Sequence, residues 1–405
     1  MKNARPLLLA ASAVALLVSA CSQAPADLKG PTLAPQFGTA DEDVGVDVAV
    51  SSVDHVYVLS DQDLECDESV PQRVLLRRYD SGGNLAWNKQ VIFSEYNYDT
   101  ECEDLRARIL QTDAQGNTYV LVSHSGISDD VRYYITYNLY KYDAAGNLLT
   151  RIDNIGKNYW AFEEPDAEHE NAIDMAVDGG GNVYLAYESS EFDYGSSESS
   201  TTNLVSKYST TGARQWQRVS TVGLPYGITV SSSGSVYVVG TTGIARYTNS
   251  GSLTWSKAAD NSKGVRSGDI VISGYHVYTR SVKDIRKYDG TGKQLWLKTQ
   301  AGLDTIVLQD MTGDANGNLY LSGKYQVSTG NFNAFTRKLN SSGSVIFTKT
   351  YGTTAYDDAL GVATLNGSEI YLTGETQGSL AHPNRGGRDG YLRKLDSSGN
   401  TVWTR

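Results

Sequence analysis

The sequence predicts an all-β fold, a seven-bladed β-propeller made of four-stranded antiparallel blades. Three observations lead to this fold class. The chain of 405 residues has 27 Tyr, 40 Gly and only 8 Pro, and aromatic and β-branched residues suit pleated strands while Gly supplies turns. One pattern of turn and strand recurs seven times along the chain. No long stretch shows the apolar period of a helix.

Residues 1–20 are predicted to be a signal peptide outside the fold. A basic start precedes an apolar run over residues 7–18, which is too short to span a bilayer comfortably. The run ends in Val18-Ser19-Ala20-Cys21, which resembles the lipobox of bacterial lipoproteins, with an ordinary secretory signal as the alternative. The resemblance implies that Cys21 is lipidated and anchors the protein in a membrane. Ser22 after it favours the outer membrane or the cell surface.

Residues 21–36 are predicted to hold the lipidated cysteine and a tether. The segment contains three of the eight prolines, Pro25, Pro31 and Pro35, so we expect it to be semi-extended, at up to ~3.1 Å per residue. Residues 37–405 remain as a single propeller domain, because repeat architectures commonly exceed the usual domain length.

Each unit contains a turn followed by a strand with Tyr, and the seven copies centre on Tyr57, Tyr119, Tyr184, Tyr237, Tyr278, Tyr320 and Tyr371. A basic strand, a Gly turn and a strand with a bulky residue follow; the bulky residues are Trp87, Leu149, Trp216, Trp255, Trp296, Phe347 and Trp403. A short alternating run comes first, so each unit supplies four strands, a to d. Four-stranded units of about 40 residues are typical of propellers.

The two ends of the chain are predicted to meet in the ring. Blade 6 passes into blade 7 through residues 347–353, whereas the chain stops at residues 403–405, short of that pattern. The missing part resembles Gln36-Phe37-Gly38-Thr39. We therefore expect residues 36–39 to lie near Trp403 and to join blade 7 to blade 1, which removes free sheet edges.

The repeats resemble a known family. Residues 314–323 and 333–343 look like the bacterial β-propeller repeat of the SBBP type, and the resemblance covers nearly all of residues 40–405. It implies the fold and an extracytoplasmic or cell-surface location, but no activity. Residues 288–296 more weakly resemble the repeats of quinone-cofactor dehydrogenases and of the barrel-assembly lipoprotein, whose rings usually have eight blades.

Long insertions fall in the b–c and d–a loops of blades 1 to 3, near residues 60–73, 92–105, 123–138, 155–171 and 188–203, on one predicted face. Residues 21–200 hold 33 acidic and 11 basic residues, whereas residues 201–405 hold 13 and 22. The sequence therefore predicts an acidic, aromatic crest on this face. Its candidate binding residues are Asp61, Asp63, Glu65, Asp67, Tyr96, Tyr98, Glu101, Glu103, Trp160, Glu163 and Glu164.

Two further sites are predicted on the crest. Cys66 and Cys102 are expected to form a disulfide in an oxidising compartment, with two free thiols as the alternative. The alternating carboxylates Asp61, Asp63, Glu65 and Asp67 suit a hard cation, so calcium is the candidate metal and a solvated acidic surface is the alternative. This segment is not an EF-hand loop, because Cys66 and Gln72 replace the required Gly and Glu.

The sequence contains no catalytic motif that spacing can identify, and its many acidic residues leave open a carboxylate pair for glycoside chemistry. The five histidines fall in different blades without metal spacing, and no Gly-x-Ser-x-Gly elbow occurs. Turn chemistry explains the Asp and Asn residues of short segments such as residues 113–117. No catalytic residue and no cofactor, apart from the candidate calcium, is therefore predicted.

The favoured function is a non-enzymatic binding or scaffold module at the bacterial cell envelope, monomeric and held at the membrane by its lipid. Its crest would engage a basic protein, a cation-bridged partner or an envelope glycan, and its charge disfavours nucleic acid. The alternative is a propeller enzyme of the lyase, glycosidase or quinone-dependent dehydrogenase type, with its site at the central opening.

Overall fold

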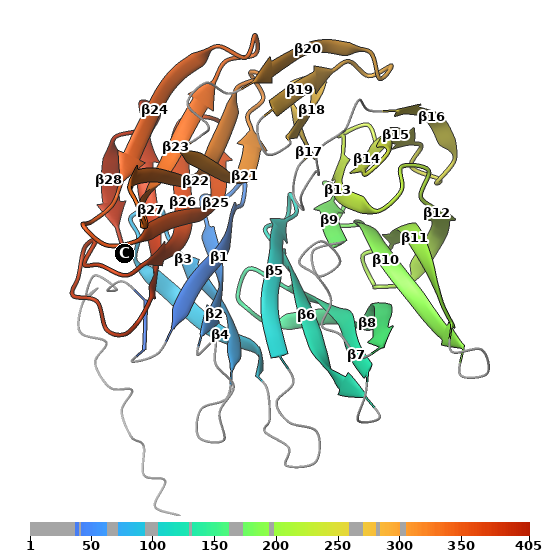
Figure 1. Ribbon diagram of the computed structural model, residues 1–405, viewed down its shortest axis with the longest axis horizontal. Helices are drawn as coiled ribbons and strands as arrows, with labels where there is room; N and C mark the ends of the chain where they lie inside the picture. The colour runs from blue at the N-terminus through green and yellow to red at the C-terminus, as the bar shows by residue number, and fades with distance from the viewer. Residues whose placement is uncertain are drawn as a thin grey trace, which may run out of the picture. The chain divides into compact units, whose positions relative to one another are not determined.

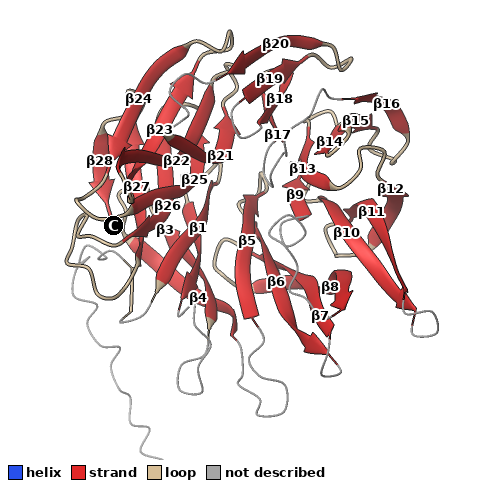
Figure 2. Ribbon diagram, viewed as in Figure 1, coloured by secondary structure: helices blue, strands red, loops and turns tan. Residues whose placement is uncertain are grey.

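The computed structural model describes residues 37–39, 42–62, 72–93, 104–128, 132–161, 173–193, 198–258, 270–280, 284–299 and 305–405. Leu33–Arg405 form one compact unit. In the described ranges the regular secondary structure consists of strands (Figure 2). We find no helix there with the length and apolar character needed to cross a bilayer.

The described strands form seven antiparallel sheets of four strands each, arranged as a ring (Figure 1). Each sheet uses four consecutive strands, paired in chain order. Each neighbouring pair of sheets is in contact, including the first and the last. The predicted fold, seven blades of four antiparallel strands, is confirmed.

The strands of the first three blades have the following bounds. Blade 1 holds β1 (Asp43–Val50), β2 (Val56–Gln62), β3 (Arg73–Tyr79) and β4 (Leu85–Phe93). Blade 2 holds β5 (Asp104–Thr112), β6 (Thr118–Ser128), β7 (Arg132–Tyr142) and β8 (Leu148–Ala161). Blade 3 holds β9 (Ile173–Val177), β10 (Val183–Asp193), β11 (Glu198–Tyr208) and β12 (Arg214–Val219).

The other four blades are as follows. Blade 4 holds β13 (Pro225–Val230), β14 (Val236–Gly240), β15 (Gly243–Tyr247) and β16 (Leu253–Ala258). Blade 5 holds β17 (Ile270–Ser273), β18 (His276–Arg280), β19 (Asp284–Tyr288) and β20 (Gln294–Thr299). Blade 6 holds β21 (Ile306–Gly313), β22 (Leu319–Ser328), β23 (Asn331–Leu339) and β24 (Val345–Tyr351). Blade 7 holds β25 (Asp357–Leu365), β26 (Glu369–Thr376), β27 (Asp389–Asp396) and β28 (Thr401–Thr404).

The second strand of each blade is apolar on both faces because a neighbouring blade covers each side. All five residues of β14, with the sequence VYVVG, are buried, and so are the first six of β2. The outer strands show the opposite pattern, because only one neighbour protects them. In β16, with the sequence LTWSKA, only Trp255 is partly buried. The core therefore lies between the blades.

In the blades that have a Trp in the outer strand, the repeated Tyr, basic and Trp residues join the blade to the next, a contact that we call the inter-blade latch. In blade 5, Lys287 Nζ lies 5.4 Å from the ring centre of Tyr278, and the ring of Trp296 lies 5.8 Å from it. Lys287 Nζ and Trp296 Nε1 both donate to the Ser341 carbonyl of blade 6, at 2.9 and 3.4 Å. Equivalent pairs share a carbonyl elsewhere: Arg78 and Trp87 at Ala144, Arg246 and Trp255 at Gly290, and Lys394 and Trp403 at Ser81.

Blade 7 is completed by the N-terminal end of the described chain. Phe37 pairs with Gly390 of β27, and its amide donates to the Gly390 carbonyl at 3.1 Å. Tyr351 holds the same register position in blade 6, where it pairs with Ala334. Trp403 packs against the apolar cluster that contains Phe37. The predicted joining of blade 7 to blade 1 is therefore confirmed.

The insertions of blades 2 and 3 differ from the prediction in one respect. Most of residues 123–138 and 188–203 lies in strands, which extend the β6–β7 and β10–β11 hairpins (Figure 2). The expectation that these segments are loops is wrong. Backbone groups pair across a hairpin, so lengthening its strands satisfies inserted residues better than an open loop does.

Candidate functional site

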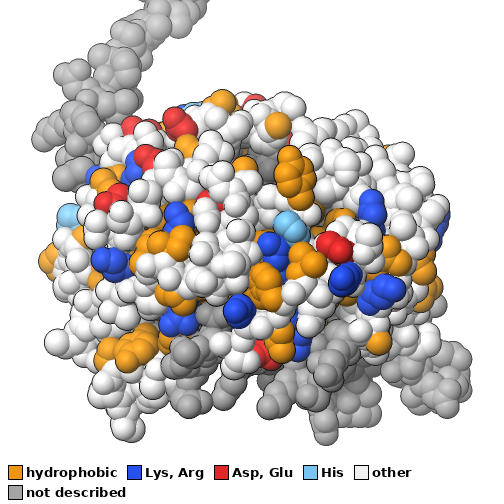
Figure 3. All heavy atoms as spheres, turned by 90° about the horizontal axis from the view of Figure 1, so that it is seen from above, with side chains coloured by type: hydrophobic (Ala, Val, Ile, Leu, Met, Phe, Trp, Pro, Cys, Tyr) orange, Lys and Arg blue, Asp and Glu red, His pale blue; other side chains and the backbone are white. Residues whose placement is uncertain are grey.

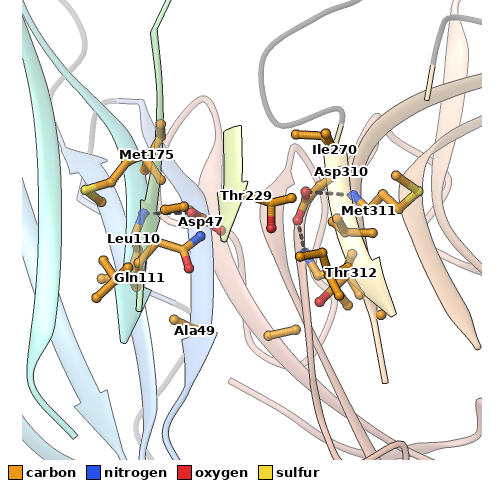
Figure 4. A pocket seen from close by; sticks show the side chains of 18 of the residues that line it. Asp47, Ala49, Leu110, Gln111, Met175, Thr229, Ile270, Asp310, Met311 and Thr312 are labelled. Atoms are coloured by element: carbon orange, nitrogen blue, oxygen red, sulfur yellow. Dashed lines mark hydrogen bonds between the residues drawn. The ribbon is translucent and has the colours of Figure 1, made fainter. Parts of the chain in front are cut away.

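The first strands of the seven blades surround an axial channel of about 620 Å³ (Figure 4). These strands are β1, β5, β9, β13, β17, β21 and β25. Aliphatic, amide and hydroxyl side chains make up most of the lining, and Gln111, Thr229 and Thr312 are examples. Asp47 and Asp310 lie on opposite sides of the space shown in Figure 4.

Three aspartates of the channel wall tie neighbouring blades together. Each carboxylate accepts the amide of the next residue in its own strand and an amide from the first strand of the next blade. The donors are Val48 and Leu110 for Asp47, Met175 and Ile228 for Asp174, and Met311 and Val362 for Asp310, at 2.6–2.8 Å. These bonds give the three aspartates a structural role.

The electrostatics of the channel follow from its carboxylates. Burial raises the pKa of Asp47 well above its usual range, and the negative charge of Asp310 raises it further. Burial also raises the pKa of Asp310. The amides that these carboxylates accept act in the opposite direction, since a hydrogen bond to the charged form stabilises it. Burial thus makes the ionised form of these two carboxylates less favourable than it is in water.

The described lining of the channel offers little for catalysis. It contains no His, Cys, Lys or Tyr, and Arg108 donates from Nε to Ser123 Oγ at 2.7 Å. Among the described residues, no group of three or more His, Cys, Asp or Glu is placed to hold a metal ion. General acid–base work needs a pair of groups with matched pKa values and free access to substrate.

A second group of polar residues lies where blades 6 and 7 meet, on the face of the b–c and d–a loops. We call it the polar network, and its members are Gln309, Lys324, Tyr356, Asp358, Glu375 and Arg388. The residues come from β21, β22, β25, β26 and the loops that flank them. Segments far apart in sequence thus bring their polar side chains together.

Asp358 is the centre of the network. Its side chain is only 1% exposed, and its Oδ2 atom accepts from Lys324 Nζ at 3.1 Å, Gln309 Nε2 at 2.9 Å and Tyr356 OH at 3.2 Å. Lys324 Nζ also donates to Tyr356 OH at 2.7 Å. Gln309 lines the axial channel, so the network reaches the rim of the channel. A buried carboxylate thus fixes a lysine and a tyrosine.

A second ion pair borders this centre. Arg388 Nη1 contacts both carboxylate oxygens of Glu375, at 3.0 and 3.2 Å, and Arg388 Nε lies 3.4 Å from Glu42 Oε1. Burial raises the pKa of Glu375, while Arg388 lowers it. Arg388 is the last residue of the loop between β26 and β27, so its contact with Glu42 holds the end of that loop against the start of blade 1.

The network presents an aromatic platform, consisting of Phe332, Tyr356 and Lys324. All three side chains are half-buried. The two rings make an edge-to-face contact at 5.9 Å, and Lys324 Nζ lies 5.5 Å from the Phe332 ring centre and 5.1 Å from that of Tyr356. Such a surface combines ring faces and a fixed ammonium group.

The protonation states of Lys324 and Tyr356 determine whether the platform can take part in proton transfer. Burial alone would lower the pKa of Lys324, but Asp358 and the bond to Tyr356 raise it above its usual value. Burial, together with the negative charge of Asp358, raises the pKa of Tyr356. Both groups therefore keep their protons at neutral pH and cannot act as a general base there. The arrangement suits binding better than proton abstraction.

The structure describes two of the predicted binding residues. Asp61 lies inside β2 rather than in the loop, is 6% exposed, and accepts the Ala107 amide of blade 2 at 2.7 Å. Burial raises the pKa of Asp61 to about 7. Trp160 lies in β8, in register with Tyr133 of β7. The other predicted site residues lie outside the described ranges: Cys21, Asp63, Glu65, Cys66, Asp67, Tyr96, Tyr98, Glu101, Cys102, Glu103, Glu163 and Glu164.

Sequence reasoning missed the polar network, although the repeats carry a signal for it. Asp61, Lys324 and Glu375 hold one register position in blades 1, 6 and 7, four residues after the repeated Tyr. A charged residue at the end of a buried strand needs a partner. Comparing this position among the repeats would have marked the b–c face of blades 6 and 7. The long loops predicted the binding site on blades 1 to 3 instead.

The fold and the channel define the chain as a seven-bladed β-propeller. No family model and no curated protein sequence matches it. Similar solved structures include a protein of unknown function from Bacteroides caccae, which is 11% identical, with 66% of this chain and 89% of that chain covered and a TM-score of 0.40. Apo AztD from Citrobacter koseri is 9% identical, with 82% of this chain and 91% of that chain covered and a TM-score of 0.41. The Neurospora crassa Pan2 WD40 domain is 9% identical, with 81% of this chain and 85% of that chain covered and a TM-score of 0.45.

Proposed function

We propose that the protein is an exported, lipid-anchored binding module of the bacterial cell envelope, which holds an envelope glycan on the b–c and d–a face of its ring. The aromatic platform on the polar network is the observation that carries this proposal. Four predictions from the sequence agree with this proposal. They are lipidation at Cys21, the tether over residues 21–36, the outer-membrane or cell-surface location and the SBBP-type repeat. They would place the ring outside the cytoplasm, where such glycans occur.

The chemistry of the platform favours a glycan over the other partners considered. Phe332 and Tyr356 are partly exposed and offer apolar area for a sugar ring, and Lys324, whose ammonium lies over both rings, offers a donor for its hydroxyl or carboxylate oxygens. A basic protein would have to approach a fixed ammonium group. Asp358 and Tyr356 already hold that group in place, so little side-chain entropy is lost on binding.

The crest of blades 1 to 3 would widen the same binding face. The residues proposed there are Asp63, Glu65, Asp67, Tyr96, Tyr98, Glu101, Glu103, Trp160, Glu163 and Glu164, with a disulfide between Cys66 and Cys102. Asp61 belongs to this proposal only as a support, because its carboxylate already accepts the Ala107 amide. Calcium at Asp63, Glu65 and Asp67 would bridge the crest to anionic groups of a glycan.

The test is co-sedimentation of the purified protein with peptidoglycan sacculi. We expect the wild type to sediment and the double variant Phe332→Ala/Tyr356→Ala to bind about tenfold more weakly, because a central aromatic contact typically contributes at least 1.4 kcal/mol. Tyr275→Ala is the matched control, since Tyr275 is 96% exposed in the turn between β17 and β18 and lies outside the network.

Two results would overturn the proposal. Undiminished sedimentation of Phe332→Ala/Tyr356→Ala would show that the platform is not the binding surface. Failure of the wild type to sediment would remove the glycan assignment. Circular dichroism of each variant checks that the ring is folded, so that a loss of binding is not a loss of structure.

A further inference from the structure

The outer strands of blades 4 to 6 share a composition that the binding face does not explain. We call them the outer wall: β16 (LTWSKA), β20 (QLWLKT) and β24 (VIFTKTY). Each carries a lysine two residues after its partly buried aromatic residue, and these are Lys257, Lys298 and Lys349. None of the three strands contains an acidic residue, although the whole chain has a net charge of −11.

Aliphatic side chains are exposed beside these lysines. Leu253 is 47% exposed, Leu295 44%, Leu297 46%, and Val345 and Ile346 both 53%. Figure 3 looks onto this side of the ring, from above β16, β20 and β24 of Figure 1, and shows Lys and Arg side chains lying among hydrophobic ones. The outer wall is therefore both cationic and apolar.

Two described acids of blade 5 are engaged with other groups. Asp284 at the start of β19 accepts from Thr299 Oγ1 at 2.8 Å and lies 3.8 Å from Arg286. Asp289 caps its own turn by accepting the amides of Thr291 and Lys293. Their charges therefore act on local donors, whereas the charge of Asp396 in blade 7 interacts with that of Lys349.

Protection of sheet edges explains only part of this pattern. Lysine on an outer strand discourages pairing with another chain. The five exposed aliphatic residues do not serve this purpose, because exposed apolar side chains make an edge more prone to association. Lysine heads with aliphatic side chains between them are instead what an anionic bilayer surface attracts, through charge and through burial in the headgroup region.

We propose that the outer wall of blades 4 to 6 rests against an anionic membrane surface. The proposal builds on the lipid anchor of the proposed function. The described chain begins at Phe37, which is bonded to blade 7, and blade 7 packs against blade 6. A tether of 16 residues would span about 50 Å. That length would allow the propeller to orient its outer wall toward the bilayer. The polar network lies on another face and stays accessible.

The test uses mature chain without its lipid, residues 22–405, which keeps every residue that the structure describes. Binding to vesicles of phosphatidylglycerol and phosphatidylcholine in equal parts is compared with binding to phosphatidylcholine alone. We expect measurable binding only to the anionic vesicles, and loss of that binding at high salt. Lys257→Gln/Lys298→Gln/Lys349→Gln should weaken binding by about fivefold per lysine, hence roughly 100-fold.

The matched control is Lys89→Gln/Arg151→Gln/Arg385→Gln, which removes the same charge from exposed positions outside the wall. Equal losses in the two triple variants would overturn the proposal, because they would indicate a general charge effect. Absence of wild-type binding, or self-association of the wild type that the wall variant abolishes, would also overturn it. Both outcomes leave the glycan experiment unaffected, since that experiment contains no lipid.

Discussion

At the scale of single residues, the interior is organised by carboxylates that accept backbone amides. Asp113 shows this in a turn, where its Oδ1 atom accepts the amides of Gln115 and Asn117 at 3.0 and 2.9 Å. Asp174 shows it between blades, with Met175 and Ile228 as donors. Turn chemistry was the predicted role of the turn aspartates, and these bonds confirm it.

Asp61 leads to a prediction about pH. Its pKa is about 7 in the folded protein, against about 3.9 in an unfolded chain. The folded state therefore binds a proton that the unfolded state releases, so the free energy of unfolding falls as pH rises from about 4 to 7, by roughly 2–4 kcal/mol from this group. Asp61→Asn keeps an oxygen for the Ala107 amide and should make the protein more stable than the wild type at pH 8.

Urea unfolding at pH 5 and pH 8 measures this effect. Asp143→Asn is the control, because hydrogen bonds from Asn147 lower the pKa of Asp143, whose titration then lies below this range. Asp47 and Asp310 also have raised pKa values. Part of the dependence of the free energy of unfolding on pH therefore remains in both variants. A pH slope in Asp61→Asn as steep as in the wild type would contradict the prediction.

At the scale of strands, the repeat motif is mainly a code for contacts between blades. The Trp ring of one blade covers a left-handed Gly of the next: a Cβ on Gly343 would lie 3.2 Å from the Trp296 ring, and φ there is +78°. Blade 2 departs from the pattern. The predicted bulky residue Leu149 is 52% exposed, and Thr150 pairs with Lys141 instead. The role given to Leu149 is therefore wrong: Leu149 falls in the bulge that blade 1 also has at Ala86, and Thr150 takes the register position that Trp87 holds there.

The inter-blade latch can be tested at Trp296. Trp296→Ala removes the ring that packs on Tyr278 and Gly343, and also the donor to the Ser341 carbonyl. We expect the free energy of unfolding to fall by about 2–3 kcal/mol, less than for a fully buried Trp because this ring is half-exposed. Leu297→Ala on the same strand is the control and should change stability by less than about 0.5 kcal/mol. Equal effects of the two changes in thermal unfolding would contradict the latch.

At the scale of the molecule, the fold was predictable and the site was not. Seven copies of the strand with the repeated Tyr predict the number of blades. The likeness of residues 36–39 to the link between blades 6 and 7 predicts how the ring is closed. The polar network could not be read in the same way, because Lys324, Asp358 and Glu375 come together only after blades 6 and 7 have packed. The repeat pattern identifies residues that all blades share. A binding site, in contrast, consists of residues at which one or two blades differ from the others.

The last prediction concerns the closure of the ring. Arg405 pairs with Leu392, and Phe37 then continues the same edge at Gly390, so two separate ends of the chain complete one blade. The Phe37 ring is 8% exposed and lies 4.5 Å from the guanidinium carbon of Arg77. Phe37→Ala removes this burial without breaking the chain, and we expect a loss of about 3 kcal/mol. The hydrogen-exchange rates should rise in β27, because the joint opens more often than the rest of the ring.

Tyr351→Ala is the matched control, because Tyr351 holds the equivalent register position in blade 6, where the chain runs on without a break. It should cost comparable stability, since it also removes a large side chain, but β23 should exchange no faster than β14 of the distant blade 4. In Phe37→Ala, faster exchange should instead be confined to β27 and its neighbours. If exchange rises uniformly around the ring, opening is global and Phe37 is one core residue among many. If it rises only beside Gly390, the closure is the weakest joint of the propeller, and tension on the predicted tether would act there first.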